Sequence, residues 1–353
     1  MISILIAFFS LVLLMVFHEL GHFLAAKKSG VKVEEFGLGY PPRIFAKKIG
    51  ETVFSINLLP LGAFVRILGE EGENNSERSF SQQPILKRVF IVSAGCISFW
   101  LVSFFLFSLS FTIGAFVSTL PEEKAQYIQV VNVFEGSPAF FAQLKSGDLI
   151  KKIIFEEKIF EINSIKQLQD LTKSFAQKEI ILEIEREGNS LKLPVIPRDD
   201  SLNQGPLGIA VVGVKKEKYP LFLAFLKGAQ ETILWTGTIL REYAKIFGKI
   251  INKEKIEAKM VGPVGVMNLF NQATKKGISY FLQFVALISI YLAIFNLLPI
   301  PALDGGKLLF LTIEAVRKKP VDPNIERKVT LFFFGLLVSL AIFITIRDIL
   351  ELI

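Results

Sequence analysis

The feature that most constrains this chain is an apolar run near its start that contains the sequence His-Glu-x-x-His. Residues 2–17 carry no charge, and the motif follows directly, from His18 to His22. Helical spacing places the two imidazoles on one face, one turn apart, where both can reach one zinc ion. Glu19 lies beside them and can act as a general base on water that the metal activates. Because ionisable residues are costly in hydrocarbon, the motif indicates a functional site rather than a polar kink in a membrane helix.

The composition supports the same hypothesis. The chain has 353 residues, 51% of them hydrophobic, which is typical of several membrane spans joined to a soluble part. Both of its two histidines belong to the motif. The net charge is +7, but the basic residues cluster at the ends of apolar runs, so we expect a lipid bilayer and no nucleic acid as partner. Cys96 is the single cysteine, which excludes an intrachain disulfide and a thiolate zinc cluster.

Four apolar segments predict about four transmembrane helices. The first covers residues 2–26, and His18 lies nine residues before Lys27, or roughly 13 Å below the basic end of that helix. The metal is therefore expected inside the membrane. The remaining spans are expected over Val89–Val117, from Tyr280 to Phe295, and over Leu331–Ile346.

Residues 31–65 predict a β-hairpin close to the first span. The segment is strand-like and has glycine and proline at its bends, including Gly37 and Gly39. Two interpretations stay open. The hairpin either lies on the cytosolic surface or dips toward the active site, where an exposed edge can pair with an extended substrate. The polar residues 69–84 that follow predict a flexible loop.

A soluble domain is expected over residues 121–214, where charges return and short strands alternate. Gly136-Ser137-Pro138-Ala139 predicts the start of a short helix, and Gly147-Asp148 ends it. This pattern resembles a PDZ domain of the bacterial protease type, which implies an α+β domain that binds extended peptide at a sheet edge. A domain that only blocks access, with an empty groove, is the alternative. The strands are expected at Tyr127–Phe134, Leu149–Phe155, Ile180–Arg186 and Leu191–Pro197.

Residues 219–250 have an apolar face interrupted by charges. This pattern favours an amphipathic helix lying on the membrane, with a spanning helix as the alternative. The segment 260–266 is rich in turn residues. The resulting domains are 1–120 with the first two spans and the hairpin, 121–214 with the soluble domain, 215–258 with the surface helix, and 259–353 with the last two spans.

A catalytic zinc takes three protein ligands, and both histidines are already used. The third ligand must be a carboxylate or Cys96, and the later membrane segments contain the carboxylates Asp304 and Glu314. Asp304 is preferred because prolines and glycines break the helix around it, so its carboxylate can be directed toward the two histidines. The alternative is that Asp304 only caps the helix that resumes after the break. If 219–250 lies on the surface, Asp304 reaches a depth similar to that of His18.

Several motifs together resemble the site-2 protease family of the RseP type. They are the His18–His22 motif, the PDZ-like insert, Gly262-Pro263-Val264-Gly265, and Asn296-x-x-Pro299 followed by Leu303-Asp304-Gly305. The resemblance implies an intramembrane zinc metalloprotease. It assigns zinc ligation to His18, His22 and Asp304, the general base to Glu19, and substrate backbone binding to Asn296. It also makes the Gly37-Leu38-Gly39 region part of a membrane-reentrant hairpin.

The resemblance further implies a polytopic α-helical protein of the inner (plasma) membrane with the PDZ-like domain outside the cytosol. Its expected substrates are single-span membrane proteins, such as an anti-sigma factor or a remnant signal peptide, trimmed beforehand by another protease. Many relatives carry two PDZ domains, whereas this chain has room for one. Two other functions are alternatives: a catalytically inactive membrane PDZ tether, and a zinc channel, which would need metal-binding groups along its spans.

Overall fold

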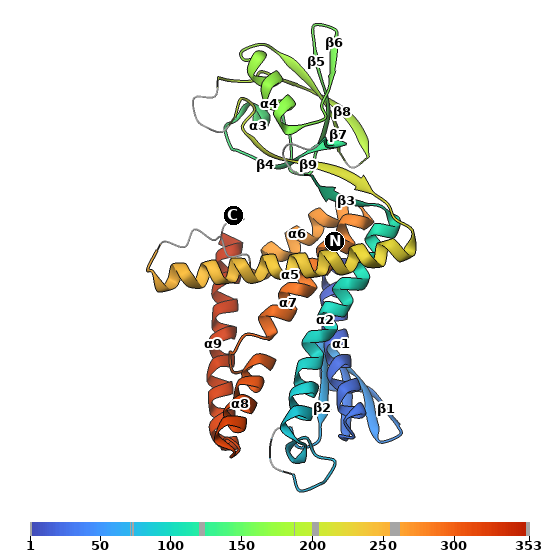
Figure 1. The fold of residues 1–353 in the computed structure, drawn as a ribbon, viewed down its shortest axis with the longest axis vertical. Coiled ribbons are helices and arrows are strands. Elements are labelled where there is room, and N and C mark those ends of the chain that lie inside the picture. The colour runs from blue at the N-terminus through green and yellow to red at the C-terminus, as the bar shows by residue number, and fades with distance from the viewer. Residues whose placement is uncertain are drawn as a thin grey trace. The chain divides into compact units, whose positions relative to one another are not determined.

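The computed structural model describes residues 2–70, 72, 74–119, 124–186, 188–199, 205–254 and 262–350. The chain forms two compact units (Figure 1). We call the first the membrane unit; it comprises Met1–Leu109, Leu221–Thr274 and Phe281–Ile353. The second, the β-rich unit, comprises Ser110–Pro220 and Lys275–Tyr280. The expected domain boundaries at 120/121 and 258/259 lie outside the described residues.

The prediction of several membrane spans is confirmed. Within the described ranges, four helices are long and apolar enough to cross a bilayer about 30 Å thick. α2 begins and ends four residues earlier than expected. It ends early because Gly114 adopts a φ of 119° and the chain then enters a strand. The four helices are α1 (Ile2–Lys28), α2 (Ile85–Ile113), α7 (Ile278–Asn296) and α9 (Pro323–Leu350).

A long antiparallel hairpin follows α1 and lies beside it (Figure 1). Its strands are β1 (Val33–Ile49) and β2 (Thr52–Ile67). Phe36 near the start of β1 is opposite both Phe54 and Val65 of β2. The first part of β1 therefore lies between two parts of β2, and the last residues of β2 form an outer edge of the sheet. An antiparallel strand pair thus occupies the segment where the sequence predicted a hairpin.

Between α7 and α8 (Asp304–Arg317) the helix is interrupted, as the prolines predicted. Ala302 has a φ of 97°, and Leu303 is the extended residue directly before the helix. Asp304 is thus the first helical residue rather than the cap. A Cβ at Gly305 would lie 2.1 Å from the carbonyl oxygen of Leu298, so only glycine lets the new helix start this close to the unwound segment.

Two further helices complete the membrane unit. α5 (Leu221–Ile251) has a strongly amphipathic sequence and is not one of the four candidate spans. α6 (Pro263–Lys275) corrects the expectation of a turn-rich segment, because residues 263–266 are helical. Pro263 occupies the first helical position, where its missing N–H costs no hydrogen bond. Met260 and Val261 of that expected segment lie outside the described residues.

The β-rich unit contains a seven-stranded antiparallel sheet with the order β3-β9-β4-β5-β7-β8, to which β6 is added beside β5. The strands expected at Leu149–Phe155 and Ile180–Arg186 have those bounds, and the other two are shifted by one or two residues. Ser137 caps the short helix α3 by accepting a hydrogen bond from the N–H of Phe140. The elements are β3 (Ala115–Ser118), β4 (Tyr127–Val133), α3 (Pro138–Phe141), β5 (Leu149–Phe155), β6 (Lys158–Glu161), α4 (Ile165–Ser174), β7 (Ile180–Arg186), β8 (Asn189–Val195) and β9 (Ile209–Glu217).

Candidate metal centre

The structure brings together the three residues expected to bind a metal. Asp304 Oδ2 lies 3.5 Å from His18 Nε2 and 3.4 Å from His22 Nε2, and the two Nε2 atoms are 3.3 Å apart. The exposed fractions of the His18 and His22 residues are 5% and 8%. One ligand atom of each residue therefore faces a common point, although His18 and Asp304 lie 286 positions apart in the chain.

These distances fit a tetrahedral zinc site. Ligand atoms about 2.0–2.1 Å from a tetrahedral zinc lie about 3.3–3.4 Å from one another. The three observed separations, 3.3–3.5 Å, match that value without rearrangement of the side chains. Two imidazoles and one carboxylate are also a ligand set of catalytic zinc, which keeps its fourth position for water or substrate. The donor set therefore fits the metal.

Groups on α2 hold the ligands in position. The Nδ1 atom of His22 lies 2.9 Å from the carbonyl oxygen of Ile91, which fixes the ring so that Nε2 faces the other ligands. The ring of Phe99 stacks on the His18 imidazole with centroids 4.7 Å apart. The Cys96 thiol donates to Asp304 Oδ2 at 3.4 Å. Cys96 therefore contacts the site as a hydrogen-bond partner of the Asp304 carboxylate.

Gly95 on α2 provides the space for the histidines. A Cβ atom at this position would lie 2.1 Å from His22 Nε2 and 2.7 Å from His18 Cε1. Gly21 has a similar role in the contact between α1 and α2, because its Cβ would lie 2.4 Å from the Ala94 carbonyl oxygen. The sequence alone does not indicate that Gly95 belongs to the site, because the role of this glycine depends on which residues of α1 face it.

Glu19 is placed between the metal site and the hairpin. Its Oε2 atom accepts a hydrogen bond from the backbone N–H of Val65 at 3.1 Å. Val65 lies on the last part of β2, so this N–H points away from β1 toward the motif. The outer strand of the hairpin therefore contacts the His-Glu-x-x-His motif through this hydrogen bond.

Glu314, the other carboxylate considered as third ligand, has a different partner. Its Oε2 accepts a hydrogen bond from Arg88 Nη1 at 2.9 Å, and Nη2 of the same guanidinium contacts Oε1. The bidentate pair links α8 to the start of α2 and lies outside the cluster of ligand atoms. Glu314 therefore has a structural ion pair, and Asp304 remains the better candidate.

The three expected substrate-binding residues lie outside the ligand cluster. Asn296 donates its amide N–H to the carbonyl oxygen of Leu292 at 2.9 Å, at the end of its own helix. A Cβ at Gly37 would lie 2.3 Å from the ring of Phe64, so the glycine makes room for that ring on the hairpin. Gly39 has a φ of 74°, and its carbonyl oxygen accepts a hydrogen bond from Asn57 at 3.1 Å. Both glycines thus shape the hairpin.

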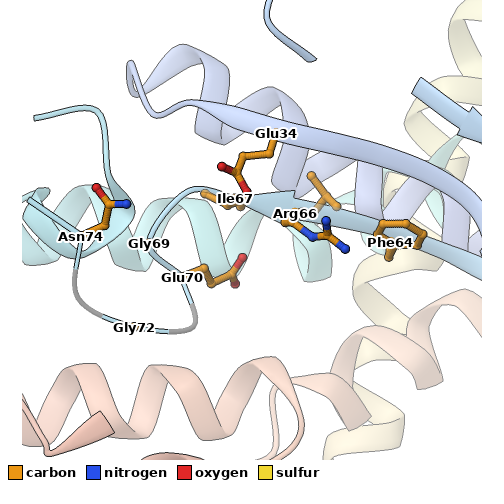
Figure 2. A pocket seen from close by; sticks show the side chains of 9 residues that line it. Glu34, Phe64, Arg66, Ile67, Gly69, Glu70, Gly72 and Asn74 are labelled. Carbon is orange, nitrogen blue, oxygen red and sulfur yellow. The ribbon is translucent and has the colours of Figure 1, made fainter. Parts of the chain in front are cut away.

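A pocket of about 410 Å³ lies along the outer part of β2 and the turn after it (Figure 2). It begins at Phe64 and Val65, the residue whose N–H reaches Glu19, and continues to Glu70 in the following turn. It is lined by Glu34, Phe64, Val65, Arg66, Ile67, Gly69, Glu70, Gly72 and Asn74.

Comparisons with known proteins agree with this geometry. The profile of peptidase family M50 matches residues 6–340. The chain is 32% identical to a protein of Clostridium perfringens named as a zinc metalloprotease, with 98% of this chain and 97% of that protein covered. It is 31% identical to a protein of the same description from Nostoc, covering 98% and 95%. It is 28% identical to the regulator of sigma-W protease RasP of Bacillus subtilis, covering 95% of each.

Proposed function

The chain belongs to peptidase family M50 and is an intramembrane zinc metalloprotease, and we propose that His18, His22 and Asp304 hold its zinc while Glu19 is the general base. The observation that carries this assignment is the set of ligand-atom separations, 3.3–3.5 Å, in a buried site beside Glu19. The family supports a zinc enzyme, and the geometry supports these residues as its centre.

The proposed reaction is peptide hydrolysis. When bound, zinc supplies a Lewis acid that polarises the scissile carbonyl and lowers the pKa of water. Glu19 takes the proton from the attacking water and delivers it to the leaving amine. The hydrogen bond from Val65 orients the Glu19 carboxylate through its Oε2 atom. The His22–Ile91 contact and the stacked Phe99 hold the two imidazoles in place through the reaction.

The outer edge of β2 is the proposed binding strand for the substrate. A helical substrate has its carbonyls in internal hydrogen bonds, so it must unwind before attack, and pairing with a sheet edge compensates for the lost bonds. Residues 64–67 form this edge next to Glu19, and the pocket beside them can receive substrate side chains. Gly37 contributes by admitting the Phe64 ring, and Gly39 by its bend in β1.

Asn296 is proposed to hold the substrate backbone. It is the last residue of α7, directly before the segment that leads to Asp304. Its amide nitrogen bonds Leu292, so the side-chain oxygen is the group that would accept a substrate N–H. An Asn296→Ala variant is expected to raise KM while zinc occupancy is unchanged.

We further propose that the domain at 121–214 is PDZ-like, lies outside the cytosol of an inner-membrane protein, and excludes substrates with large folded external domains. The capped start of α3 at Ser137 and the antiparallel sheet support the resemblance. The substrates would then be single-span membrane proteins already trimmed by another protease. Replacing residues 124–212 with a Gly/Ser linker should permit cleavage of untrimmed substrate. A folded, zinc-loaded deletion that still rejects it would refute the size filter.

The topology that accompanies this proposal has both termini and residues 121–214 outside, α5 on the membrane surface, and residues 27–88 and 317–328 in the cytosol. Single cysteines introduced in a Cys96→Ser background can be labelled from either side with an impermeant reagent. Labelling of a cysteine near residue 160 only from the cytosolic side would refute this arrangement.

The experiment that tests the function is reconstitution of the purified full chain in lipid with a panel of single-span substrates. We expect cleavage with zinc, loss of cleavage after chelation, and recovery when zinc is restored. A chelated protein that cleaves at the untreated rate would contradict the zinc mechanism. Sequencing of the products locates the cut, and a cut far outside the membrane-spanning segment would contradict an intramembrane site.

A further inference from the structure

The helix that carries Asp304 is held to the base of the hairpin by one lysine. We propose that Lys307 and Glu70 form a clasp that positions Asp304 for zinc, an inference that rests on the zinc site proposed above. Lys307 Nζ donates to Glu70 Oε1 at 2.7 Å, and each side chain is 25% exposed. The same ammonium lies 5.3 Å from the centroid of the Phe80 ring. Lys307 is thus held by an ion pair and by a cation–π contact.

Both partners of Lys307 are fixed to the hairpin base. Glu70 belongs to the turn that continues β2 past Gly69, where it lies in the wall of the pocket (Figure 2). Phe80 is 4% exposed, and its N–H donates to the carbonyl oxygen of Leu68 at 2.8 Å. The N–H of Leu68 donates in turn to the carbonyl oxygen of Lys32, just after α1, at 3.0 Å. The clasp therefore reaches back to the helix of the two histidines.

On the other side, Lys307 lies close to the metal site along α8. It follows Asp304 by three residues, which places both on the same side of the first helical turn. Leu308 and Leu311 of this helix pack in one hydrophobic cluster with Ala25 and Ala26 near the end of α1. The ion pair is thus a polar contact at the edge of an apolar interface, and it restrains the turn that begins with Asp304.

Zinc and the clasp favour the same arrangement of these elements. Zinc joins α1 to α8 through His18, His22 and Asp304, and the clasp joins the hairpin base to α8 one turn away. An ion pair that stabilises the arrangement able to bind zinc raises the apparent affinity for zinc. Zinc binding in turn stabilises the ion pair by the same free energy. Lys307 and Glu70 are therefore positioning residues: they do not touch the metal or substrate, and they act through Asp304.

The test measures zinc affinity of the purified full chain by competition with a fluorescent chelator. The variants are Lys307→Gln, Glu70→Gln and both together, and the exposed residues Arg317 and Glu77 provide the matched controls R317Q and E77Q. We expect each single variant to bind zinc about three- to fivefold more weakly, as for the loss of a partly exposed ion pair. The double variant should bind no more weakly than Lys307→Gln alone, because the ion pair and the contact of the ammonium with Phe80 are already lost in that single variant.

Charge exchange distinguishes positioning from a general loss of stability. The E70K/K307E protein should recover the part of the zinc affinity that the ion pair supplies and bind more tightly than Lys307→Gln, since the pair is restored in reverse while the contact with Phe80 is not. Raising a salt whose anion does not bind zinc from about 0.05 to about 1 M should weaken zinc binding more in the wild-type protein than in Glu70→Gln, because the wild type also loses the screened ion pair. This salt titration needs only one variant and remains informative if Lys307→Gln does not fold.

The failures of the two proposals are distinguishable. If Lys307→Gln and Glu70→Gln bind zinc as tightly as R317Q and E77Q, the clasp is refuted while the zinc site stands. If Asp304→Ala, measured in the same series, binds zinc as tightly as the wild type, the ligand assignment itself is wrong. A drop in thermal stability without a change in zinc affinity would make the ion pair structural only and would also overturn the positioning role.

Discussion

The metal centre and the β-rich unit are built in opposite ways. The metal centre depends on a few polar atoms brought within 3.3–3.5 Å of one another by α1 and α8, together with one glycine on α2. The β-rich unit depends on many interchangeable aliphatic side chains. Its core includes Ile128, Val130, Ile150, Ile153, Ile180 and Leu182, all fully buried. Changes at single positions should therefore abolish function in the first region and only reduce stability in the second.

The largest effect is expected for Glu19→Gln. The amide keeps the size of the side chain but cannot take the proton from water, so hydrolysis should fall by about 10²–10⁴-fold or more. The three zinc ligands are untouched, so bound zinc, measured by atomic absorption, should stay at the wild-type level. Cleavage by the purified variant at close to the wild-type rate would refute the assignment of Glu19 as the base.

The next largest effect is expected for Asp304→Ala. Removing one of three ligands should lower zinc affinity by more than about 100-fold, beyond the loss seen for partners of ligands. Chelator competition measures this directly, and activity should return in part at high zinc concentration. Full zinc occupancy of this variant at low zinc concentration would show that another residue is the third ligand. Cys96, whose Sγ lies 3.4 Å from Asp304 Oδ2, would be the next candidate.

Gly95→Ala tests how closely the centre is packed. The added methyl group would lie 2.1 Å from His22 Nε2, so a ligand must move and zinc affinity should fall by about tenfold or more. The matched control is Gly237→Ala on α5, where a Cβ meets no atom within 4 Å. That change should leave zinc binding unaltered and stabilise its helix slightly. Equal zinc affinity in the two variants would show that the site tolerates more volume than the structure indicates.

The two regions also differ in how far the sequence predicted them. Spacing alone placed His18 and His22 on one helix face, and the prolines and glycines around Asp304 indicated a helix break there. Apolar length gave the four candidate spans, although α2 was expected four residues too late. These features are local, so they can be detected within a short window of sequence.

What could not be predicted depends on contacts between distant segments. The role of Gly95 requires knowing that α2 passes the two histidines, and the contact of Cys96 with Asp304 joins residues 208 positions apart. The short strand β3 pairs with β9, almost one hundred residues later, and gave no signal alone. At Pro263 a proline interpreted as a turn residue instead begins a helix.

Ile150→Ala tests whether a change in the core of the β-rich unit leaves the metal centre unaffected. Ile150 is fully buried and lies opposite Ile128 and Ile184 in the sheet. Its truncation should destabilise this unit by about 2–5 kcal/mol, with zinc affinity unchanged. Hydrogen exchange of the sheet amides measures the first effect, and the exposed Ile159→Ala provides the control. A parallel loss of zinc affinity would show that the two regions are coupled.

The smallest effect is expected at the hairpin turn, where Glu51 accepts hydrogen bonds from Arg78 at 2.7 and 2.8 Å and from Lys27 at 2.6 Å. Arg78 first and Lys27 second lower the pKa of the Glu51 carboxyl from 4.5 to about 2. Because the folded-state pKa is the lower one, the stabilisation is complete above pH 4.5 and is lost as the pH falls toward 2.

Carbon NMR of labelled glutamate should show this titration of Glu51, and Arg78→Gln should move its midpoint to higher pH. At neutral pH, zinc binding should not respond to Arg78→Gln, because the ion pair is exposed and screened. An unmoved midpoint would show that Arg78 does not hold this carboxylate in solution.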